Sequence, residues 1–338
     1  MSRVPSTSLP ALAAAVTVVL WAMSFVAIRS AGHAFSPGVL ALGRLAVAVL
    51  ALSVMVLALA SSRRRVGAVS PFRPPRGRAL LLVVAYGVAW FGAYTIVLNW
   101  AERHIDAGTA SLLVNFAPIL VAVIAGLFLG EGFSPPLLVG IAIAFGGVVL
   151  ITFGGGQAQA DWLGVGLGLL AALLYAAGVL LQKLALATVD ALTATFWGAV
   201  AGLIVTLPFV PAALDEIAAA SGADLAWMVF LGVGPTAIAF TTWAYALART
   251  DAGAMAAMTL VVPALVIIVS WLLLGEIPTP LRIVGGVACL LGVALTRGLI
   301  RLPRGLVSRA GERSEEISVP SVAVVGGQDQ LEKGQVEP

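Results

Sequence analysis

Long runs of apolar residues, separated by short polar stretches, divide most of the chain into ten segments. A helix crosses a bilayer with about 20 predominantly apolar residues, whereas a membrane β-strand alternates apolar and polar residues over about ten. The runs in this chain are continuously apolar, so we expect an all-α polytopic membrane protein with ten transmembrane helices. The predicted segments are 9–29, 36–60, 79–99, 107–130, 136–154, 162–186, 190–213, 224–248, 253–275 and 280–300.

The composition supports a membrane protein and excludes two other classes. Of 338 residues, 60% are apolar or aromatic and only 10% are charged, against about 25% charged residues in a soluble domain. A soluble fold could not bury so much apolar surface, and a disordered chain would be rich in charge. The single cysteine, Cys289, excludes an internal disulfide and a multi-cysteine metal site. We expect no metal and no cofactor, and the net charge of +3 does not indicate a nucleic-acid partner.

The distribution of arginine and lysine predicts the orientation in the membrane. Residues 61–78 form a polar loop with six arginines, whereas the loops expected on the other side carry only Arg29, Arg103 and Arg282. Cytoplasmic loops carry the excess of positive charge in membrane proteins. We therefore expect both termini in the cytoplasm, a location in the inner (plasma) membrane of a bacterium, and a mobile cytoplasmic tail over residues 301–338.

The two halves of the chain are similar to each other. Residues 99–150 align without a gap to residues 244–295, and 17 of the 52 positions are identical. The first helices of the halves match more weakly, with Trp21 opposite Tyr175. Each half then holds five spans, and an odd number of spans places the second half upside down in the membrane. We predict a first five-helix repeat over residues 1–155 and an inverted second repeat over residues 156–300.

An inverted repeat is typical of secondary transporters, in which two halves expose one central site to either side in turn. A channel or scramblase with a continuous path is the alternative from another class. An intramembrane enzyme would need catalytic residues, and the chain has no phosphate-binding loop, no H-E-x-x-H motif and no histidine at membrane depth. We expect a transporter and no enzymatic activity.

The chain resembles the drug/metabolite transporter superfamily, and within it the ten-helix EamA branch, over about residues 9–300. The resemblance implies a central cavity between the halves and export of amino acids or other metabolites. Within the branch, the chain is most similar to YddG-type exporters of aromatic and other neutral amino acids. A multidrug or nucleotide-sugar carrier of the same fold is the alternative. The resemblance rests on the Leu20–Phe25 segment (LWAMSF), Arg44, Pro118, Pro263 and the Gly-Glu pairs Gly130-Glu131 and Gly275-Glu276.

Helical spacing groups the side chains that are candidates for the cavity wall. Trp21 and Phe25 share one face of the first helix, and Trp90 and Tyr94 share one face of the third. Each aromatic residue has the alternative role of core packing or an interfacial belt, and each buried amide that of a bond between helices. Aromatic walls with few charges suit neutral or aromatic substrates. The predicted substrate-binding residues are Trp21, Phe25, Trp90, Tyr94, Asn115, Tyr175, Gln182, Thr241 and Met258.

Arg44 lies deep inside the second predicted span, about 12 Å from the outer end of its helix. A charge at this depth is costly in a membrane. Three interpretations stay open. The side chain extends to the interface, forms a structural charge pair with Glu276 at the outer end of the ninth helix, or binds a substrate carboxylate.

Pro118 and Pro263 fall in the middle of the predicted fourth and ninth helices. Because proline has no amide hydrogen, each one bends its helix. We predict that both act as hinges for alternating access, with a static kink as the alternative.

No acidic residue falls in the middle of a predicted span, and His33 and His104 map to outer loops. Proton-coupled carriers commonly use a carboxylate within the membrane. We therefore expect an uncoupled facilitator that runs on the substrate gradient. Its partners are a small-molecule substrate and membrane lipid, and both halves in one chain predict a functional monomer.

Overall fold

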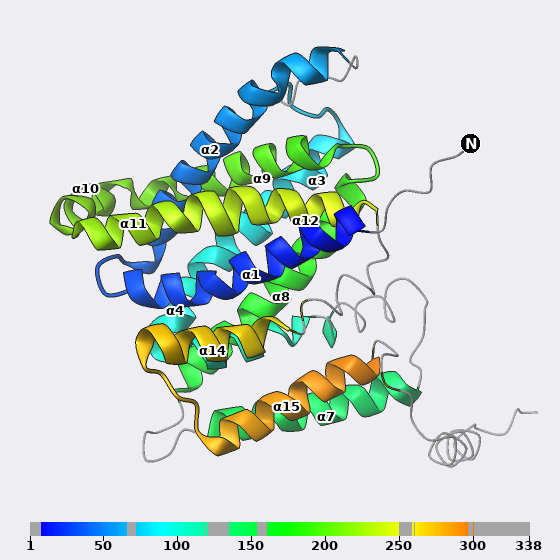
Figure 1. The fold of residues 1–338 in the computed structure, drawn as a ribbon, viewed down its shortest axis with the longest axis vertical. Coiled ribbons are helices and arrows are strands. Elements are labelled where there is room, and N and C mark those ends of the chain that lie inside the picture. Colours follow the sequence, from blue (N-terminus) through cyan, green and yellow to red (C-terminus); the bar gives the residue numbers. More distant parts are fainter. Residues whose placement is uncertain are drawn as a thin grey trace, which may run out of the picture. The chain divides into compact units, whose positions relative to one another are not determined.

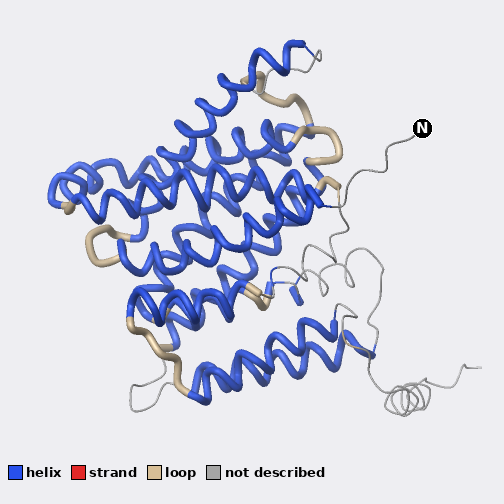
Figure 2. The backbone as a smooth tube through the Cα atoms, viewed as in Figure 1, coloured by secondary structure: helices blue, strands red, loops and turns tan. Residues whose placement is uncertain are grey.

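The computed structural model describes residues 8–65, 72–117, 119–120, 135–153, 161–249, 259, 261–296 and 300. Within these ranges every regular element is a helix, as Figure 2 shows. The all-helical class is therefore confirmed for this part of the chain. Pro118, Met258 and the tail after residue 300 lie outside the described residues.

Each of the ten predicted segments contains a helix. The first half has α1 (Ser8–Ala31), α2 (Pro37–Arg65), the continuous run α3 (Arg78–Tyr86), η1 (Gly87–Tyr94) and α4 (Thr95–His104), then α5 (Ala107–Val114) and α7 (Pro135–Phe153). The second half has α8 (Trp162–Ala185), then α9 (Ala191–Thr206), η2 (Leu207–Phe209) and α10 (Val210–Ala219). It continues with α11 (Gly222–Leu231), η3 (Gly232–Ile238) and α12 (Ala239–Leu247), followed by α14 (Val262–Leu274) and α15 (Pro280–Thr296).

Six of the described helices are long and apolar enough to cross a membrane. Large apolar side chains remain exposed on their outer surfaces, for example Leu50 at 67% and Leu214 at 70%. Exposed apolar surface on this scale is unfavourable in water and expected in lipid. The six helices are Leu9–Ala31, Pro37–Ala58, Arg78–His104, Trp162–Ala185, Ala191–Ala219 and Gly222–Leu247, and Val262–Leu274 is a shorter apolar helix.

Acidic and hydroxyl side chains fix where several helices begin. Asp106, Asp161 and Asp190 each accept a hydrogen bond from the backbone amide three residues later, which satisfies a free donor in the first turn. Ser221 and Asp224 form a reciprocal capping box at the start of α11. The sequence thus sets these helix starts through local contacts alone.

The helices pack in reciprocal pairs. Helix α1 contacts α11, η3, α12 and α14, while α8 contacts α3, η1, α4 and α5. Helix α2 contacts η3, α9 contacts η1, and α2 also contacts α9. Figure 1 shows α1 beside α12 and α14, and α7 running along α15. Several contacts in the first half of the chain therefore have a matching contact in the second half, such as α2 with η3 and α9 with η1.

Two helical runs contain a π-helical segment at matching positions. The segment η1 begins at Gly87 and η3 at Gly232, which are 145 positions apart, as are the aligned halves of the sequence. A π-turn inserts an extra residue into a helix and rotates the faces of the turns after it. In η3 the wide turn accommodates Pro235, which has no amide hydrogen. The hydroxyl of Thr236 there donates to the carbonyl of Leu231, five residues back, at 2.7 Å.

Polar contacts join helix ends on one side of the bundle. The His33 ring nitrogen lies 3.2 Å from the Asp224 carboxylate at the start of α11. The His104 Nδ1 atom lies 2.9 Å from the Asp161 carboxylate, at the start of α8. On this side α1 and α4 therefore end where α8 and α11 begin.

Candidate substrate cavity

A cavity lies between the helices of the two halves. The free space among its lining atoms is about 540 Å³ including its opening, and the centre of a water molecule can reach about 40 Å³ of it. The cavity is narrow, and a ligand the size of an amino acid requires the walls to move apart. The lining residues are Trp21, Ser24, Phe25, Arg44, Trp90, Tyr94, Leu98, Val114, Asn115, Tyr175, Phe240, Thr259 and Val262.

Aromatic rings form a continuous part of the wall. Trp21 contacts Trp90, Tyr175 and Phe240, with ring centroids 6.0, 6.1 and 5.4 Å apart. Trp90 lies 4.9 Å from both Tyr175 and Phe240, in edge-to-face arrangements. These geometries are favourable for aromatic pairs. The contact predicted between Trp21 of α1 and Tyr175 of α8 is present.

Several buried polar atoms around the cavity have no hydrogen-bond partner. They are the indole nitrogens of Trp21 and Trp90, Nη1 of Arg44 and Oδ1 of Asn115. Buried polar groups in proteins are almost always satisfied, so unpaired ones need an explanation. Four such atoms on the wall of one cavity are groups that a bound ligand or water can satisfy.

Arg44 extends from α2 into this wall and is only 4% exposed. Its Nε donates a hydrogen bond of 2.6 Å to the hydroxyl of Thr236 in η3. The two backbones come close because residue 232 is glycine: a Cβ atom there would lie 2.7 Å from the carbonyl oxygen of Arg44. The interpretation that the Arg44 side chain extends to the membrane interface is wrong, since the side chain is buried at the cavity.

Of the nine predicted substrate-binding residues, the structure places eight, in three different surroundings. Gln182 is buried away from the cavity, where its amide bonds the hydroxyl of Tyr86 and the indole of Trp243, each at 3.1 Å. Thr241 borders a separate surface pocket with Tyr245 and Arg249. Met258 lies outside the described residues. The six that line the cavity are Trp21, Phe25, Trp90, Tyr94, Asn115 and Tyr175.

Phe240 is a wall residue that the sequence reasoning missed. The prediction on this helix took the polar residue Thr241, whereas the cavity is lined by its neighbour Phe240. The π-segment η3 ends at Ile238, directly before this position, and changes the face that the next residues present. Pro235 inside an apolar helix was the available signal. Ser24, Leu98, Val114, Thr259 and Val262 also line the cavity.

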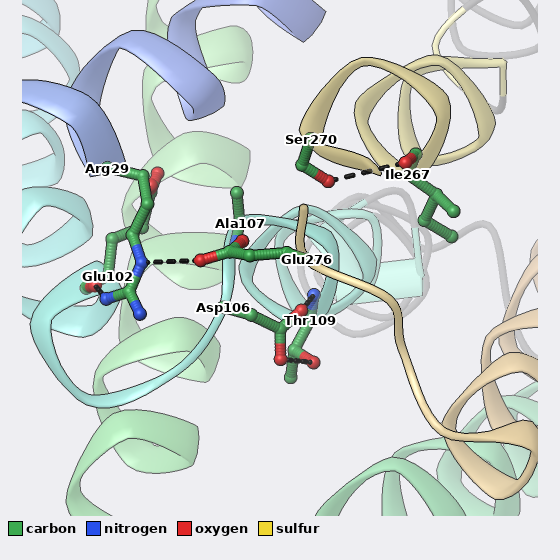
Figure 3. Close-up of polar contacts among 8 residues, drawn as sticks. All are labelled: Arg29, Glu102, Asp106, Ala107, Thr109, Ile267, Ser270 and Glu276. Atoms are coloured by element: carbon green, nitrogen blue, oxygen red, sulfur yellow. Dashed lines mark hydrogen bonds and ion pairs between the residues drawn. The ribbon is translucent and has the colours of Figure 1, made fainter. Parts of the chain in front are cut away.

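Glu276 pairs with Arg29, so the predicted pair of Glu276 with Arg44 is wrong. The Arg29 Nε atom lies 2.8 Å from the Glu276 carboxylate, and Arg29 Nη1 donates to the Glu102 carbonyl oxygen at 2.6 Å (Figure 3). Gly275 ends α14 with a left-handed φ of 67°, which is favourable for glycine and directs the chain away from the helix axis. The contacts tie the end of α1 to the segment after α14.

Pro263 does not lie in the middle of a described helix. It is the second residue of α14, where a missing amide hydrogen leaves no bond unmade. Helix α5 correspondingly ends at Val114, and Asn115 and Phe116 form a turn. Val114, Asn115 and Val262 all line the cavity. The end of α5 and the start of α14 therefore both face the cavity.

Glu102 bears on the question of proton coupling. The third span extends to His104, five residues beyond its predicted end, and Glu102 lies inside it with 2% exposure. Neither of its carboxylate oxygens has a hydrogen-bond partner. The sequence predicts no acidic residue in the middle of a span, and Glu102 agrees with this, since it is a buried carboxyl group in the last turn of α4.

A bundle of apolar helices around an aromatic cavity is the architecture of a membrane transporter. The EamA-like transporter family model matches residues 8–153 and again residues 162–298. The chain belongs to this family.

Curated relatives are named as transporters. The chain is 35% identical, over 82% of its length and 90% of the relative's, to a "probable terminal-alkyne amino-acid exporter" of Streptantibioticus cattleyicolor. It is 34% identical to the transporter YdfC of Bacillus subtilis, over 82% of this chain and 87% of that one. A crystal structure of a protein 19% identical covers 87% of this chain and 99% of its own with a TM-score of 0.60, which shows a shared fold.

Proposed function

We propose that this transporter carries small neutral metabolites, above all aromatic and other neutral amino acids, through the aromatic cavity by alternating access. The observation that carries the proposal is the cavity itself, with aromatic rings and unpaired polar atoms on one wall. Rings supply apolar contact area and the unpaired atoms orient a small polar group, as in other small-molecule sites. The name of the Streptantibioticus relative supports an amino-acid substrate and the outward direction.

Alternating access fits two inverted halves, and three observations support that arrangement here. The family model matches the chain twice. The two halves make matching helix contacts: α1 packs against α12, and α8 packs against α4. The contact of His104 with Asp161 places the end of α4 beside the start of α8, and the contact of His33 with Asp224 places the end of α1 beside the start of α11. Equivalent helices then run in opposite directions, with repeats over residues 1–155 and 156–300.

The proposed orientation places this joined end of the bundle outside the cell. Residues 61–65, predicted as the start of an arginine-rich loop, instead form the last turn of α2, whose first residue, Pro37, accepts a hydrogen bond from Asn99 at the joined end. The end of α2, with Arg63, Arg64 and Arg65, therefore lies at the opposite end, which the excess of arginine assigns to the cytoplasm. Both termini would then be cytoplasmic, in a bacterial inner membrane.

The energy source is left out of the proposal. An uncoupled facilitator is predicted because no acidic residue falls in the middle of a span; buried Glu102 lies near the end of its span, and the facilitator stays a prediction. Exchange of labelled for unlabelled substrate across a membrane needs no external energy source, so a test of carrier activity is possible without this knowledge.

The test is counterflow in proteoliposomes that contain the purified chain. Labelled phenylalanine, methionine, threonine and lysine are compared without a pH gradient and then with one. Saturable counterflow of the neutral substrates supports a carrier. Flux without saturation or counterflow indicates a channel or scramblase, and counterflow of drugs or nucleotide sugars alone indicates the other substrate class.

A further inference from the structure

Arg44 is a buried cation whose charge has no ion-pair partner among the described residues. The ion pair found there joins Arg29 to Glu276, and the other close contacts of basic with acidic side chains join His33 to Asp224 and His104 to Asp161. Burial of a charge without a partner is strongly unfavourable in a protein interior and in a membrane. Its retention at a cavity wall points to a negative partner that is not part of the chain.

The Arg44 guanidinium is held in place on one side and free on the other. Thr236 donates its hydroxyl hydrogen to the Leu231 carbonyl, so its oxygen is available to accept from Arg44 Nε at 2.6 Å. Arg44 Nη1, in contrast, has no partner. A guanidinium fixed through Nε presents its two terminal nitrogens as a fork, the geometry that matches a carboxylate.

Glu102 does not neutralise this fork by contact. Both of its carboxylate oxygens are buried without a hydrogen-bond partner, so neither is bonded to Arg44. Glu276 is bonded to Arg29. The remaining wall groups around Arg44 are neutral, among them Tyr94 and Asn115.

We propose that Arg44 binds the carboxylate of the transported molecule, with Nη1 as a donor, and that the transporter therefore selects substrates with a free carboxylate. The inference rests on the proposed transport through this cavity and names the group that is recognised there. Asn115 Oδ1, which is also unpaired, accepts from the substrate ammonium. Helix α14 adds positive potential, because it begins at Val262 on the same wall. The apolar side chain of the substrate lies against Trp21, Trp90 and Phe240.

The experiment compares three probes of similar size in proteoliposome counterflow. Phenylalanine has both charges, phenylalaninamide lacks the carboxylate charge, and phenethylamine lacks the carboxyl group. Wild-type protein is expected to prefer phenylalanine over each of the others by about tenfold or more, the scale of a charge-assisted hydrogen bond. Arg44→Gln is expected to lose this preference, Arg44→Lys to keep part of it, and Arg103→Gln, at an exposed position, to behave as wild type.

Three results count against these expectations. Equal counterflow of phenylalanine and phenylalaninamide by wild-type protein overturns the role of Arg44 while it leaves the carrier intact. Full preference in a folded Arg44→Gln variant overturns it as well. No saturable counterflow of any amino acid or analogue by folded wild-type protein overturns the amino-acid transport proposal, and the carboxylate site with it. The comparison of probes on wild-type protein decides the point even if Arg44→Gln does not fold.

Discussion

The Arg29 guanidinium lies 2.8 Å from the Glu276 carboxylate and connects the end of α1 to the segment after α14. Glu276 also accepts a bond from the Ala107 amide, at the start of α5, at 3.4 Å. Three helix ends of the two halves therefore meet at one acidic side chain. Since α1 and α14 both contribute to the cavity wall, this contact connects two helices that line the cavity.

A double-mutant cycle tests this contact. We expect Arg29→Gln and Glu276→Gln each to lower the thermal stability of the protein in detergent, and the double variant to lose less than the sum. The side chains are 37% and 22% exposed, so the coupling energy should be about 1 kcal/mol or less. The matched control is the cycle of Arg44→Gln with Glu276→Gln, which should be additive. Additivity in the first cycle, or coupling in the second, would contradict the observed pairing.

The indole nitrogen of Trp21 provides a second prediction. Because it is buried and unpaired at the cavity, Trp21→Phe should raise the KM for counterflow several-fold while the wall remains aromatic. Trp243→Phe is the matched control. Its indole already bonds Gln182 at 3.1 Å and does not line the cavity, so this variant should lose stability and keep its KM. An unchanged KM in Trp21→Phe, together with a raised KM in Trp243→Phe, would show that substrate does not contact Trp21.

The close approach of α2 and η3 predicts a strong effect at Gly232. A methyl group there meets the Arg44 carbonyl oxygen and the Val47 side chain, at 2.7 and 2.6 Å. We expect Gly232→Ala to destabilise the protein by about 1–3 kcal/mol and to weaken substrate binding by displacing Arg44. Gly166→Ala in α8 meets no atom within 4 Å and should be neutral or slightly stabilising. Thermal unfolding of the two variants, followed by binding assays, checks both expectations.

Asp161 predicts a pH dependence of stability at the start of α8. The Gly164 amide, and then the His104 ring, hold the pKa of this carboxyl below its usual value. A pKa lowered by folding stabilises the protein above the ordinary pKa of aspartate and loses that effect as the pH falls through the lowered value. Asp161→Ala should therefore cost about 1 kcal/mol at neutral pH and progressively less below about pH 4.

The variant Asp161→Asn distinguishes the contribution of the capping hydrogen bond from that of the carboxylate charge. Asp161→Asn retains a good capping side chain and should lose only a part of the stability, without the acid dependence. Unfolding temperatures between pH 3 and 7 measure both variants. An Asp161→Ala deficit that does not change with pH would show that the carboxylate charge contributes nothing.

Sequence reasoning succeeded where the physical signal is local or repeated. Apolar run length located a helix in every predicted segment, and the alignment of the halves predicted the contact of Trp21 with Tyr175. It failed where backbone geometry departs from the regular α-helix. On the helix after the π-segment η3 the wall residue is Phe240 and not the predicted Thr241, and a π-segment departs from the 3.6 residues per turn of a regular helix.

Charged residues were harder to place than apolar ones. Glu102 was assigned to a loop because the apolar run stops before it, while the helix continues to His104. The partner of Glu276 was misjudged since two arginines were available and only their three-dimensional positions distinguish them. Long side chains and helix ends depend on tertiary contacts, which apolar run length does not encode.

Passage of substrate through the cavity shared by the two halves is the central claim. The most direct test fills that cavity with Val114→Phe and measures counterflow of phenylalanine, with Thr241→Phe in the separate surface pocket as the control. We expect folded Val114→Phe protein to lose counterflow and Thr241→Phe protein to keep it. Normal counterflow by folded Val114→Phe protein would contradict transport through this cavity.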